Sequence, residues 1–261
     1  MARTLRDAVI MLGPLTASDP DDLATADRKG KIYTDYSQFL NADGLQGKKI
    51  GVEKSFLKGH EAIDALLQKA LEDMKSKGAT IVEVDLMEPL KKLEGLEYEV
   101  LKYEFKDGLN RYLAARGAKY KTLEELIKFN EENKEKELKL FGQELFVDSQ
   151  KKGGLESKEY VDALGKIRKA TREDGIDAAL ANNKLDALVA PTTGGSWSVA
   201  AVAGYPYITV PLGLRENAAT GMAFFGKPYS EPELIKFAYA FEQRTKGRVT
   251  PQFLPTYPKK Q

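Results

Sequence analysis

The sequence is poor in the residues that build metal and redox sites. Its 261 residues include no cysteine, one histidine (His60) and one tryptophan (Trp197). The absence of cysteine excludes disulfides, thiolate metal sites and a cysteine nucleophile, and one histidine excludes a multi-histidine metal site. No phosphate loop, dinucleotide fingerprint or metal-ligand spacing is present. The sequence therefore predicts neither a metal site nor a cofactor, and it favours a capping or surface role for His60.

Charge and hydropathy exclude further classes. The 40 Lys and Arg residues balance the 39 Asp and Glu residues, so we expect no nucleic acid or anionic membrane as partner. No segment approaches the ~20 consecutive apolar residues of a membrane span. Residues 1–6 do not begin a secretory signal, which favours a cytoplasmic location. The hydrophobic fraction of 42% predicts a packed globular protein.

One strand–helix–strand pattern lies in the first half of the chain. Residues 48–52 form a strand-like segment, and residues 63–74 carry an apolar stripe with helical spacing. Residues 79–85 alternate and are rich in β-branched side chains, which is typical of a second strand. This arrangement predicts neighbouring parallel strands joined by a right-handed crossover.

Three more strands are predicted in the second half, at residues 185–190, 207–210 and 222–225. Proline cannot donate a hydrogen bond to a strand ladder, so we expect Pro191 to end the first of these strands and Pro211 the second. Together with the crossover unit, they predict an α/β fold.

Helix starts are marked by capping-box spacings, in which Ser or Thr precedes an acidic residue by three positions. Three such pairs occur: Thr4 with Asp7, Thr122 with Glu125, and Ser230 with Glu233. Apolar residues at helical spacing accompany two of these pairs. The stripe after Thr4 is Leu5, Ala8, Val9 and Leu12, and the stripe after Ser230 is Leu234, Phe237, Ala238 and Phe241. We expect both stripes to face the core.

The sequence predicts a charged helical insertion at residues 88–155. Mixed-sign charges in this segment indicate solvated helix faces stabilised by pairs four residues apart. Tyr98 and Tyr103 are expected to be partly in the core. One apolar face is predicted from Leu101, Phe105, Leu109 and Tyr112.

Several short motifs stand near both ends of the chain: residues 1–8 (MARTLRDA) and 19–22 (DPDD), 185–192 (LDALVAPT) with 203–211 (AGYPYITVP), and 224–226 (FFG), 230–234 (SEPEL) and 240–243 (AFEQ), followed by 251–256 (PQFLPT). In their order and spacing these segments resemble the amidase-signature family, in particular its peptide-amidase branch. The resemblance implies a mixed β-sheet flanked by helices, with residues 1–261 as the C-terminal portion of that fold.

The same resemblance implies amide hydrolysis by a serine nucleophile, a bridging serine and a lysine. A serine hydroxyl needs a base, and a lysine can serve as that base when its surroundings lower its pKa. In the family this catalytic segment precedes the stretch that residues 1–8 resemble. We therefore expect the N-terminal catalytic half to be absent and assign no catalytic residue in this chain.

Substrate contacts are predicted for Thr192, Thr193 and Trp197, which follow a strand end and lie in a Gly-rich segment. Two structural alternatives stay open, since the threonines can satisfy their own turn and the tryptophan can anchor the loop. Ser196 follows Gly194 and Gly195 and suggests a nucleophile, but its position matches a substrate-side loop of the family. Loop structure is the favoured interpretation for Ser196.

Three hypotheses remain for the function. In the first, the chain is a fragment or subunit of an amidase, which is inactive alone and acts on a small amide only when it is completed. In the second, it is a non-catalytic α/β module that binds a partner or associates with itself. In the third, it is an unrelated α/β protein. Half of a shared sheet leaves strand edges and apolar faces uncovered. We therefore expect either an N-terminal half as partner or self-association.

Overall fold

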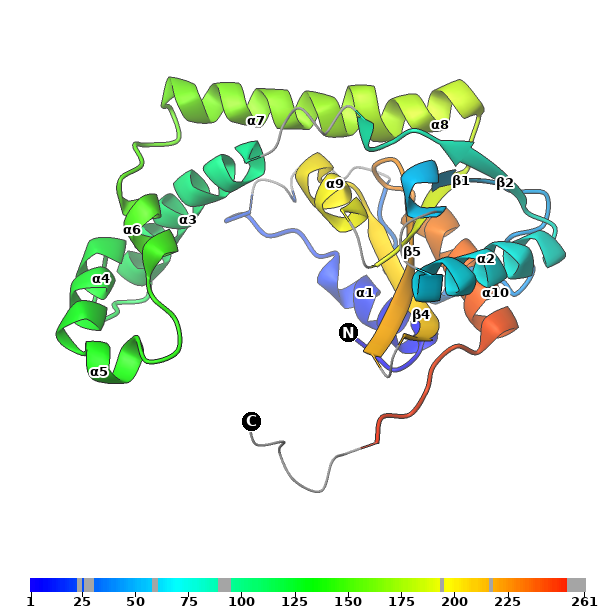
Figure 1. Ribbon diagram of the computed structural model, residues 1–261, viewed down its shortest axis with the longest axis horizontal. Coiled ribbons are helices and arrows are strands. Elements are labelled where there is room, and N and C mark those ends of the chain that lie inside the picture. Colours follow the sequence, from blue (N-terminus) through cyan, green and yellow to red (C-terminus); the bar gives the residue numbers. More distant parts are fainter. Residues whose placement is uncertain are drawn as a thin grey trace. The chain divides into compact units, whose positions relative to one another are not determined.

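The computed structural model describes residues 1–22, 25, 31–57, 61–88, 95–192, 195–215 and 218–252, with the side chains of residues 61–64 excepted. Two compact units divide the chain. Residues 1–88 and 172–261 form the first, here called the sheet unit, and residues 89–171 form the second, the helical unit. Both are visible in Figure 1.

A five-stranded mixed sheet organises the sheet unit. Its strands are β1 (Lys49–Glu53), β2 (Thr80–Val84), β3 (Ala187–Pro191), β4 (Tyr207–Arg215) and β5 (Ala218–Phe225). They lie in the order β2-β1-β3-β5-β4. The pairs of β1 with β2 and with β3 are parallel, whereas β5 is antiparallel to both β3 and β4. The predicted α/β class and mixed sheet are therefore confirmed.

The predicted crossover unit is present. Helix α2 (Glu61–Ser76) joins β1 to β2, and these strands pair in parallel from Lys49 opposite Thr80 to Glu53 opposite Val84. The helix buries Leu67, Ala70, Leu71 and Met74. These residues recur at helical spacing, which is why their stripe predicts the helix and the face that packs on the sheet.

Side chains alternate between two buried faces of the sheet. Ala187 and Val189 of β3 belong to the main hydrophobic cluster, with Met222 and Phe224 of β5. The intervening residues of both strands are also buried, including Phe225. Period-two alternation places successive side chains on opposite faces, so both faces of the central strands are covered.

Helices of the sheet unit supply that cover. They are α1 (Leu5–Leu15), α2, α8 (Ala178–Asn183), α9 (Ser196–Ala203) and α10 (Glu231–Thr245), with short 3-10 helices at Ser37–Phe39 and Lys54–Leu57 and a π-helix at Arg172–Asp177. Helix α10 packs against α1, α2, β4 and β5. Its buried residues include Leu234, Phe237, Ala238 and Phe241, which confirms the predicted stripe. Figure 1 shows α10 next to α2 and β4.

One of the three predicted capping boxes is complete, since Thr122 and Glu125 form both of its hydrogen bonds. At Thr4 only the N-cap bond is present: its side chain accepts from the backbone N–H of Asp7, and its hydroxyl donates to the Asp7 carboxylate. Ser230 is the N-cap of α10 but makes no capping bond, because its hydroxyl donates to the carbonyl of Lys227 at 2.7 Å. The predicted helix start at Ser230 is therefore confirmed, whereas the predicted capping hydrogen bond of Ser230 is wrong.

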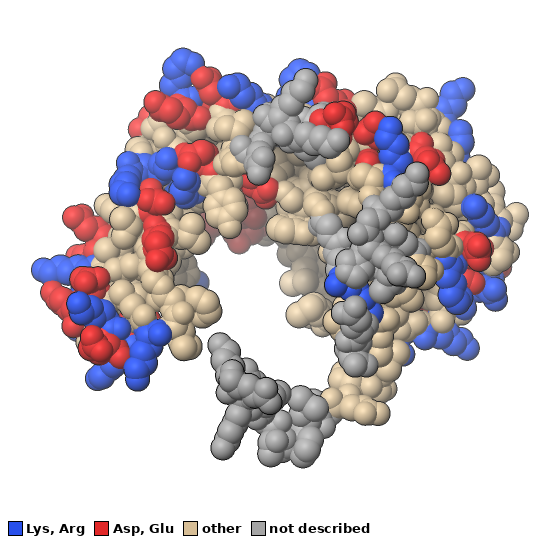
Figure 2. Space-filling model, in the orientation of Figure 1, with Lys and Arg blue, Asp and Glu red and all other residues tan. Residues whose placement is uncertain are grey.

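The helical unit consists of α3 (Leu96–Ala115), α4 (Leu123–Glu132), α5 (Lys134–Glu137), α6 (Glu144–Gln150) and α7 (Lys158–Thr171). Helices α3 and α7 pack through Tyr103 and Tyr160, whose ring centroids are 5.6 Å apart. The Tyr160 hydroxyl donates to Glu104 at 2.8 Å. Burial, with that carboxylate, raises the pKa of Tyr160 to about 12. On the face shown in Figure 2, acidic and basic side chains are interspersed over these helices.

The predicted apolar face of α3 is only partly covered: Leu109 is half-buried, and Phe105 packs on Phe146 of α6 with ring centroids 5.4 Å apart. Leu101, Phe105 and Tyr112 are exposed, whereas Val100 and Tyr103 of α3 are buried. Tyr98 is 59% exposed, so of the two predicted tyrosines only Tyr103 lies in the core. Helix α3 has two partly apolar faces, and the face with Val100 and Tyr103 is the one that is buried when α3 packs against α7.

The prediction that Pro211 ends a strand is also wrong. Pro191 is the last residue of β3, but β4 continues through Pro211 to Arg215. A register shift between Pro211 and Gly213 marks an irregularity at this point. Strand β4 lies at the edge of the described sheet, and edges and bulges are the places in a sheet that tolerate proline.

Core packing of α2 gives a direct stability prediction. Replacing the fully buried Leu67 by alanine should lower the free energy of unfolding by about 2–5 kcal/mol, because it leaves a cavity against the sheet. Urea unfolding followed by circular dichroism measures the change. Leu15→Ala is the control, since Leu15 is 73% exposed on α1. Equal losses for the two variants would contradict the packing described.

Candidate functional site

Two adjoining hollows lie along the edge strand of the sheet unit. The larger, of about 660 Å³, runs beside β4 and β5 and is bordered by residues 1–5 at the start of α1. The smaller, of about 330 Å³, lies between β4, α1 and α10. Ala8, Tyr207 and Ile208 line both hollows. We refer to the two together as the β4 groove.

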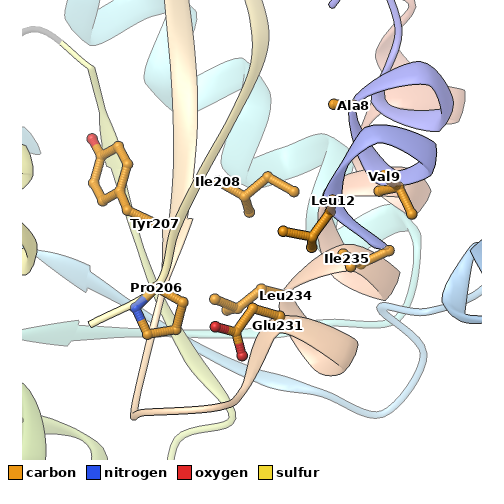
Figure 3. A pocket seen from close by; sticks show the side chains of 9 residues that line it. All are labelled: Ala8, Val9, Leu12, Pro206, Tyr207, Ile208, Glu231, Leu234 and Ile235. Carbon is orange, nitrogen blue, oxygen red and sulfur yellow. The ribbon is translucent and has the colours of Figure 1, made fainter. Parts of the chain in front are cut away.

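The smaller hollow has mainly apolar walls. Leu12 from α1, Ile208 from β4 and Ile235 from α10 provide side chains from three elements. In Figure 3, Leu12 and Ile208 point toward one another, while the ring of Tyr207 lies on the other side of the strand. The carboxyl group of Glu231 lies near Pro206. One charged side chain is thus placed in an otherwise apolar hollow.

Glu231 is an unusual residue in this position. Its Oε2 is buried and has no hydrogen-bond partner among the described residues. Burial raises the pKa of the carboxyl group above its ordinary value, although the residue's own backbone N–H opposes this effect. An unpaired buried carboxylate costs free energy, and a donor brought to it would recover much of that cost.

Tyr207 connects the groove with the opposite face of the sheet. Its ring stacks on Phe225 with centroids 5.6 Å apart. Its hydroxyl lies 3.3 Å from the Oγ atom of Ser196, the first residue of α9. Burial raises the pKa of Tyr207, and the Ser196 hydrogen bond acts in the opposite direction.

Ser196 is therefore a structural residue in this arrangement. Sequence reasoning favoured a loop at this position, but α9 begins here and the residue is fully buried. The described hydrogen-bond partner of its hydroxyl is the phenol of Tyr207, which is a weak base. A nucleophilic serine needs a stronger base within reach. Gly194, which precedes it in the motif, lies outside the described residues.

Thr192 ties β3 to β5 at the larger hollow. Its hydroxyl accepts from the N–H of Gly221 at 3.0 Å and donates to the Gly221 carbonyl at 3.3 Å. Its backbone N–H donates to the same carbonyl at 2.9 Å. A side chain at position 221 would clash with Thr192 and Thr209, so glycine is required by this close approach. Thr192 borders the hollow while its hydroxyl is used by the backbone.

The other two predicted contact residues differ in their position. Trp197 is 56% exposed on the first turn of α9 and is thus accessible to a ligand. Thr193 lies outside the described residues, as does His60. The structure brings Thr192 to the β4 groove, while Trp197 is not among the residues that line either hollow.

Polar contacts hold the start of α1 and the end of α9 in place. The N–H of Leu5 donates to Oε1 of Glu242 at 2.8 Å, which holds the start of α1 against α10. At the end of α9, Arg172 donates to the carbonyl of Ala203 at 2.6 Å, and Tyr205 donates to Asp177 at 2.9 Å. Burial, with Asp177, raises the pKa of Tyr205 to about 12. The adjacent Gly204 ends α9 at φ 69°, as expected for a glycine in a tight turn.

The described part of the chain offers neither a metal site nor a membrane span. It contains no group of three or more His, Asp or Glu side chains that could hold a metal ion. Within the same residues, no helix combines the length and apolar character needed to cross a bilayer.

Comparison with known proteins identifies the family. The sequence model of the amidase family matches residues 1–198. The chain belongs to the amidase family. The fold agrees with this assignment, since the chain is similar to the native peptide amidase of Stenotrophomonas maltophilia with a TM-score of 0.92 and 41% identity. That match covers 97% of this chain and 54% of the peptide amidase.

Curated relatives show the same partial coverage. A probable amidase of Arabidopsis thaliana is 35% identical over 263 residues, which cover 97% of this chain and 49% of that protein. One subunit of the glutamyl-tRNA(Gln) amidotransferase of Carboxydothermus hydrogenoformans is 30% identical over 94% of this chain and 54% of its own length. This chain thus spans about half the length of the relatives it matches.

Tyr207 and Glu231 were not singled out from the sequence. Tyr207 was interpreted as a strand residue, and Glu231 belongs to the polar start of a helix, where acidic residues are common. The only local signal is that the Tyr207 strand is uncharged from Tyr207 to Leu214. Glu231 shares its hollow with residues of α1, which is distant in sequence.

The hydroxyl of Thr192 gives a testable distinction between structural and ligand roles. Thr192→Val keeps the shape and leaves the Gly221 N–H without its side-chain acceptor, which should lower stability by about 1–3 kcal/mol. Thermal and urea unfolding measure this loss. Thr209→Val, on the exposed surface of β4, serves as the control. A Thr192→Val protein as stable as the wild type would mean that the hydroxyl is free to serve a ligand.

The pKa of Glu231 predicts a pH dependence of stability. Because the folded pKa is raised, the folded state holds the proton more tightly, and ionisation on going above pH ~4.3 lowers stability. Glu231→Gln should therefore gain stability relative to wild type as the pH rises toward neutrality. Urea unfolding at acidic and neutral pH measures this difference.

Glu233 provides the control of opposite sign. Burial acts to raise its pKa, but Lys236 and Lys48 outweigh that effect and lower it. Its ionised form thus contributes stability above the ordinary glutamate pKa, and this contribution is lost as the pH falls. Glu233→Gln should lose stability at neutral pH. A Glu231→Gln variant that behaves like Glu233→Gln would contradict the unpaired state of Glu231.

Proposed function

We propose that this chain forms one half of an amide hydrolase that acts on peptide amides. The observation that supports this best is the likeness to a peptide amidase, at 41% identity and a TM-score of 0.92 over 97% of the chain. Proteins that share a fold can differ in chemistry. Here both the sequence identity and the family match extend over the segment that carries Thr192 and Trp197.

The catalytic groups are proposed to come from the half of the amidase fold that this chain does not match. The resemblance to the amidase-signature family implies a serine nucleophile, a bridging serine and a lysine. In the described part of the sheet unit, the buried Ser196 and Ser230 are bonded to Tyr207 and to the carbonyl of Lys227, respectively. Neither bond provides the activating base that a serine nucleophile requires.

This chain is then proposed to supply the substrate side of the site. Trp197 exposes a large apolar ring that can contact a substrate side chain without a change of conformation. Thr192, fixed by its three bonds to Gly221, holds the backbone at the end of β3 in one position. Thr193, next in sequence, is proposed as a second polar contact. In this proposal the chain binds and orients the amide, and the other half performs the acyl transfer.

A domain exchange tests this function. The half of the Stenotrophomonas maltophilia peptide amidase that corresponds to this chain is replaced by residues 1–261, and ammonia release from an amidated peptide is measured. We expect turnover by the chimera and none by residues 1–261 alone. Trp197→Ala in the chimera should raise KM by about tenfold with a smaller effect on kcat, as for the loss of a uniform binding contact.

Matched variants separate the possible outcomes. Val161→Ala, which removes an exposed apolar side chain on α7, should leave KM unchanged. A folded chimera that hydrolyses other amides but no peptide amide would contradict the substrate class. Turnover by residues 1–261 alone that Ser196→Ala abolishes would overturn the division of roles, because Ser196 would then be the nucleophile.

A further inference from the structure

Two short segments of the sheet unit adjoin its boundaries with the helical unit. Residues 86–88 lead out of the sheet unit, and the π-helix at Arg172–Asp177 is the first part of the chain after its return. Both segments contact the ends of α9, the helix that carries Trp197. The outgoing segment contacts the residue before α9, and the returning segment contacts the last residue of α9 and the turn beyond it.

The outgoing segment is anchored by a buried carboxylate. Glu53, the last residue of β1, is 2% exposed, and its Oε2 accepts from the N–H groups of Leu86 and, at 3.1 Å, of Met87. Its Oε1 accepts from the N–H of Ser55 at 3.0 Å. Hydrogen bonds from backbone N–H groups to a carboxylate are stronger than bonds between neutral groups. Residues 86 and 87 are therefore firmly attached to the end of β1.

Met87 extends this attachment to the start of α9. Its methyl carbon lies so close to Gly195 that a Cβ at position 195 would be only 2.9 Å from it. The absence of a side chain at Gly195 permits this contact. Gly195 immediately precedes Ser196 and Trp197, the first two residues of α9. The carboxylate of Glu53 thus fixes, through Met87, the backbone from which α9 begins.

The returning segment holds the other end of α9. Backbone hydrogen bonds in a π-helix join residues five apart, so Arg172 and Asp177 lie one above the other on the same side. Arg172 donates from Nε to the carbonyl of Ala203 at 2.6 Å, and its guanidinium carbon lies 5.8 Å from the ring centre of Tyr205. The Tyr205 hydroxyl donates to Asp177 at 2.9 Å. An α-helix of 3.6 residues per turn would separate these two side chains around its axis, so the π-helix allows both to reach Tyr205.

We propose that these two anchored segments position α9, and with it Trp197, for contact with a substrate. Glu53, Arg172 and Asp177 are then positioning residues, which act through α9 and touch no substrate themselves. The helical unit is one continuous stretch, so both of its covalent connections to the sheet unit pass through these segments. A displacement of the helical unit therefore acts on both ends of α9 and couples that unit to the substrate side of the site. Single π-helical turns within helices are frequent at functional sites.

This inference rests on the proposed function for the role of Trp197, but its first test needs no turnover. Trp197 is the only tryptophan of the chain, so tryptophan fluorescence reports on α9 alone. Tyr205→Phe removes the hydrogen bond to Asp177 and keeps the ring. In residues 1–261 we expect this variant to lose fluorescence anisotropy at Trp197. We also expect the amides of α9 to exchange with solvent about tenfold faster, because a lost hydrogen bond to a carboxylate favours local opening.

Tyr160→Phe is the matched control. It removes the same kind of bond, from a tyrosine hydroxyl to the carboxylate of Glu104, but within the helical unit. The anisotropy of Trp197 and the exchange of α9 should therefore stay as in the wild type. Glu53→Gln weakens the anchor at the other end of α9 and should act in the same direction as Tyr205→Phe. Circular dichroism of each variant verifies that it is folded.

The chimera with the peptide amidase provides a second test. Tyr205→Phe should raise KM with little change in kcat, because it disturbs a binding contact and no reacting group. When Trp197→Ala is already present, adding Tyr205→Phe should raise KM no further. Such non-additivity is expected when one residue acts through another. A chimera without turnover would count against the proposed function alone, since fluorescence and hydrogen exchange decide the positioning of α9 independently.

Three results would overturn the proposal. The first is a folded Tyr205→Phe variant whose Trp197 anisotropy and α9 exchange equal those of the wild type. The second is an equal change in both measurements for Tyr160→Phe, which would indicate a general loss of stability. The third is a KM effect of Tyr205→Phe in the chimera that adds in full to that of Trp197→Ala, because Tyr205 would then act independently of Trp197.

Discussion

The antiparallel pairing of β3 with β5 is the contact on which the rest of the sheet unit depends. It joins the parallel strands β2, β1 and β3 to the hairpin of β5 and β4. Thr192 and Gly221 close this pairing with hydrogen bonds between a side chain and the backbone, where the absence of a Cβ at Gly221 permits their close approach. Because β3 is buried on both faces, a disturbance here would reach the core on both sides of the sheet.

The two buried faces of the sheet have different consequences for function. The face with Phe224 packs on α2 and α10 and forms the main hydrophobic cluster. The other face carries the stacked rings of Tyr207 and Phe225, with Ser196 bonded to the Tyr207 hydroxyl. This contact fixes the start of α9 and thereby the position of Trp197. The proposed substrate side of the site is therefore positioned by a structural serine.

The edge of the sheet shows what the fold leaves uncovered. Burial on both faces uses most of the apolar surface of the central strands, but β4 keeps an uncharged edge beside apolar walls. Glu231 stands at the same place with one buried oxygen that has no partner among the described residues. A carboxylate in this state is poorly solvated, and any hydrogen-bond donor that reached it would stabilise it.

Local patterns in the sequence determined most of the element types. The stripe of Leu67, Leu71 and Met74, the alternation after Gly78 and the capping box at Thr122 depend on neighbouring residues, so the sequence alone predicts them. The resemblance of the chain ends also identified the family. Tertiary structure decided which face of α3 is buried, that β4 continues through Pro211, and that Ser196 begins a helix. It also placed Glu231 in a hollow shared by elements far apart in sequence. Such outcomes depend on packing between distant segments, and short-range periodicity carries no information about that packing.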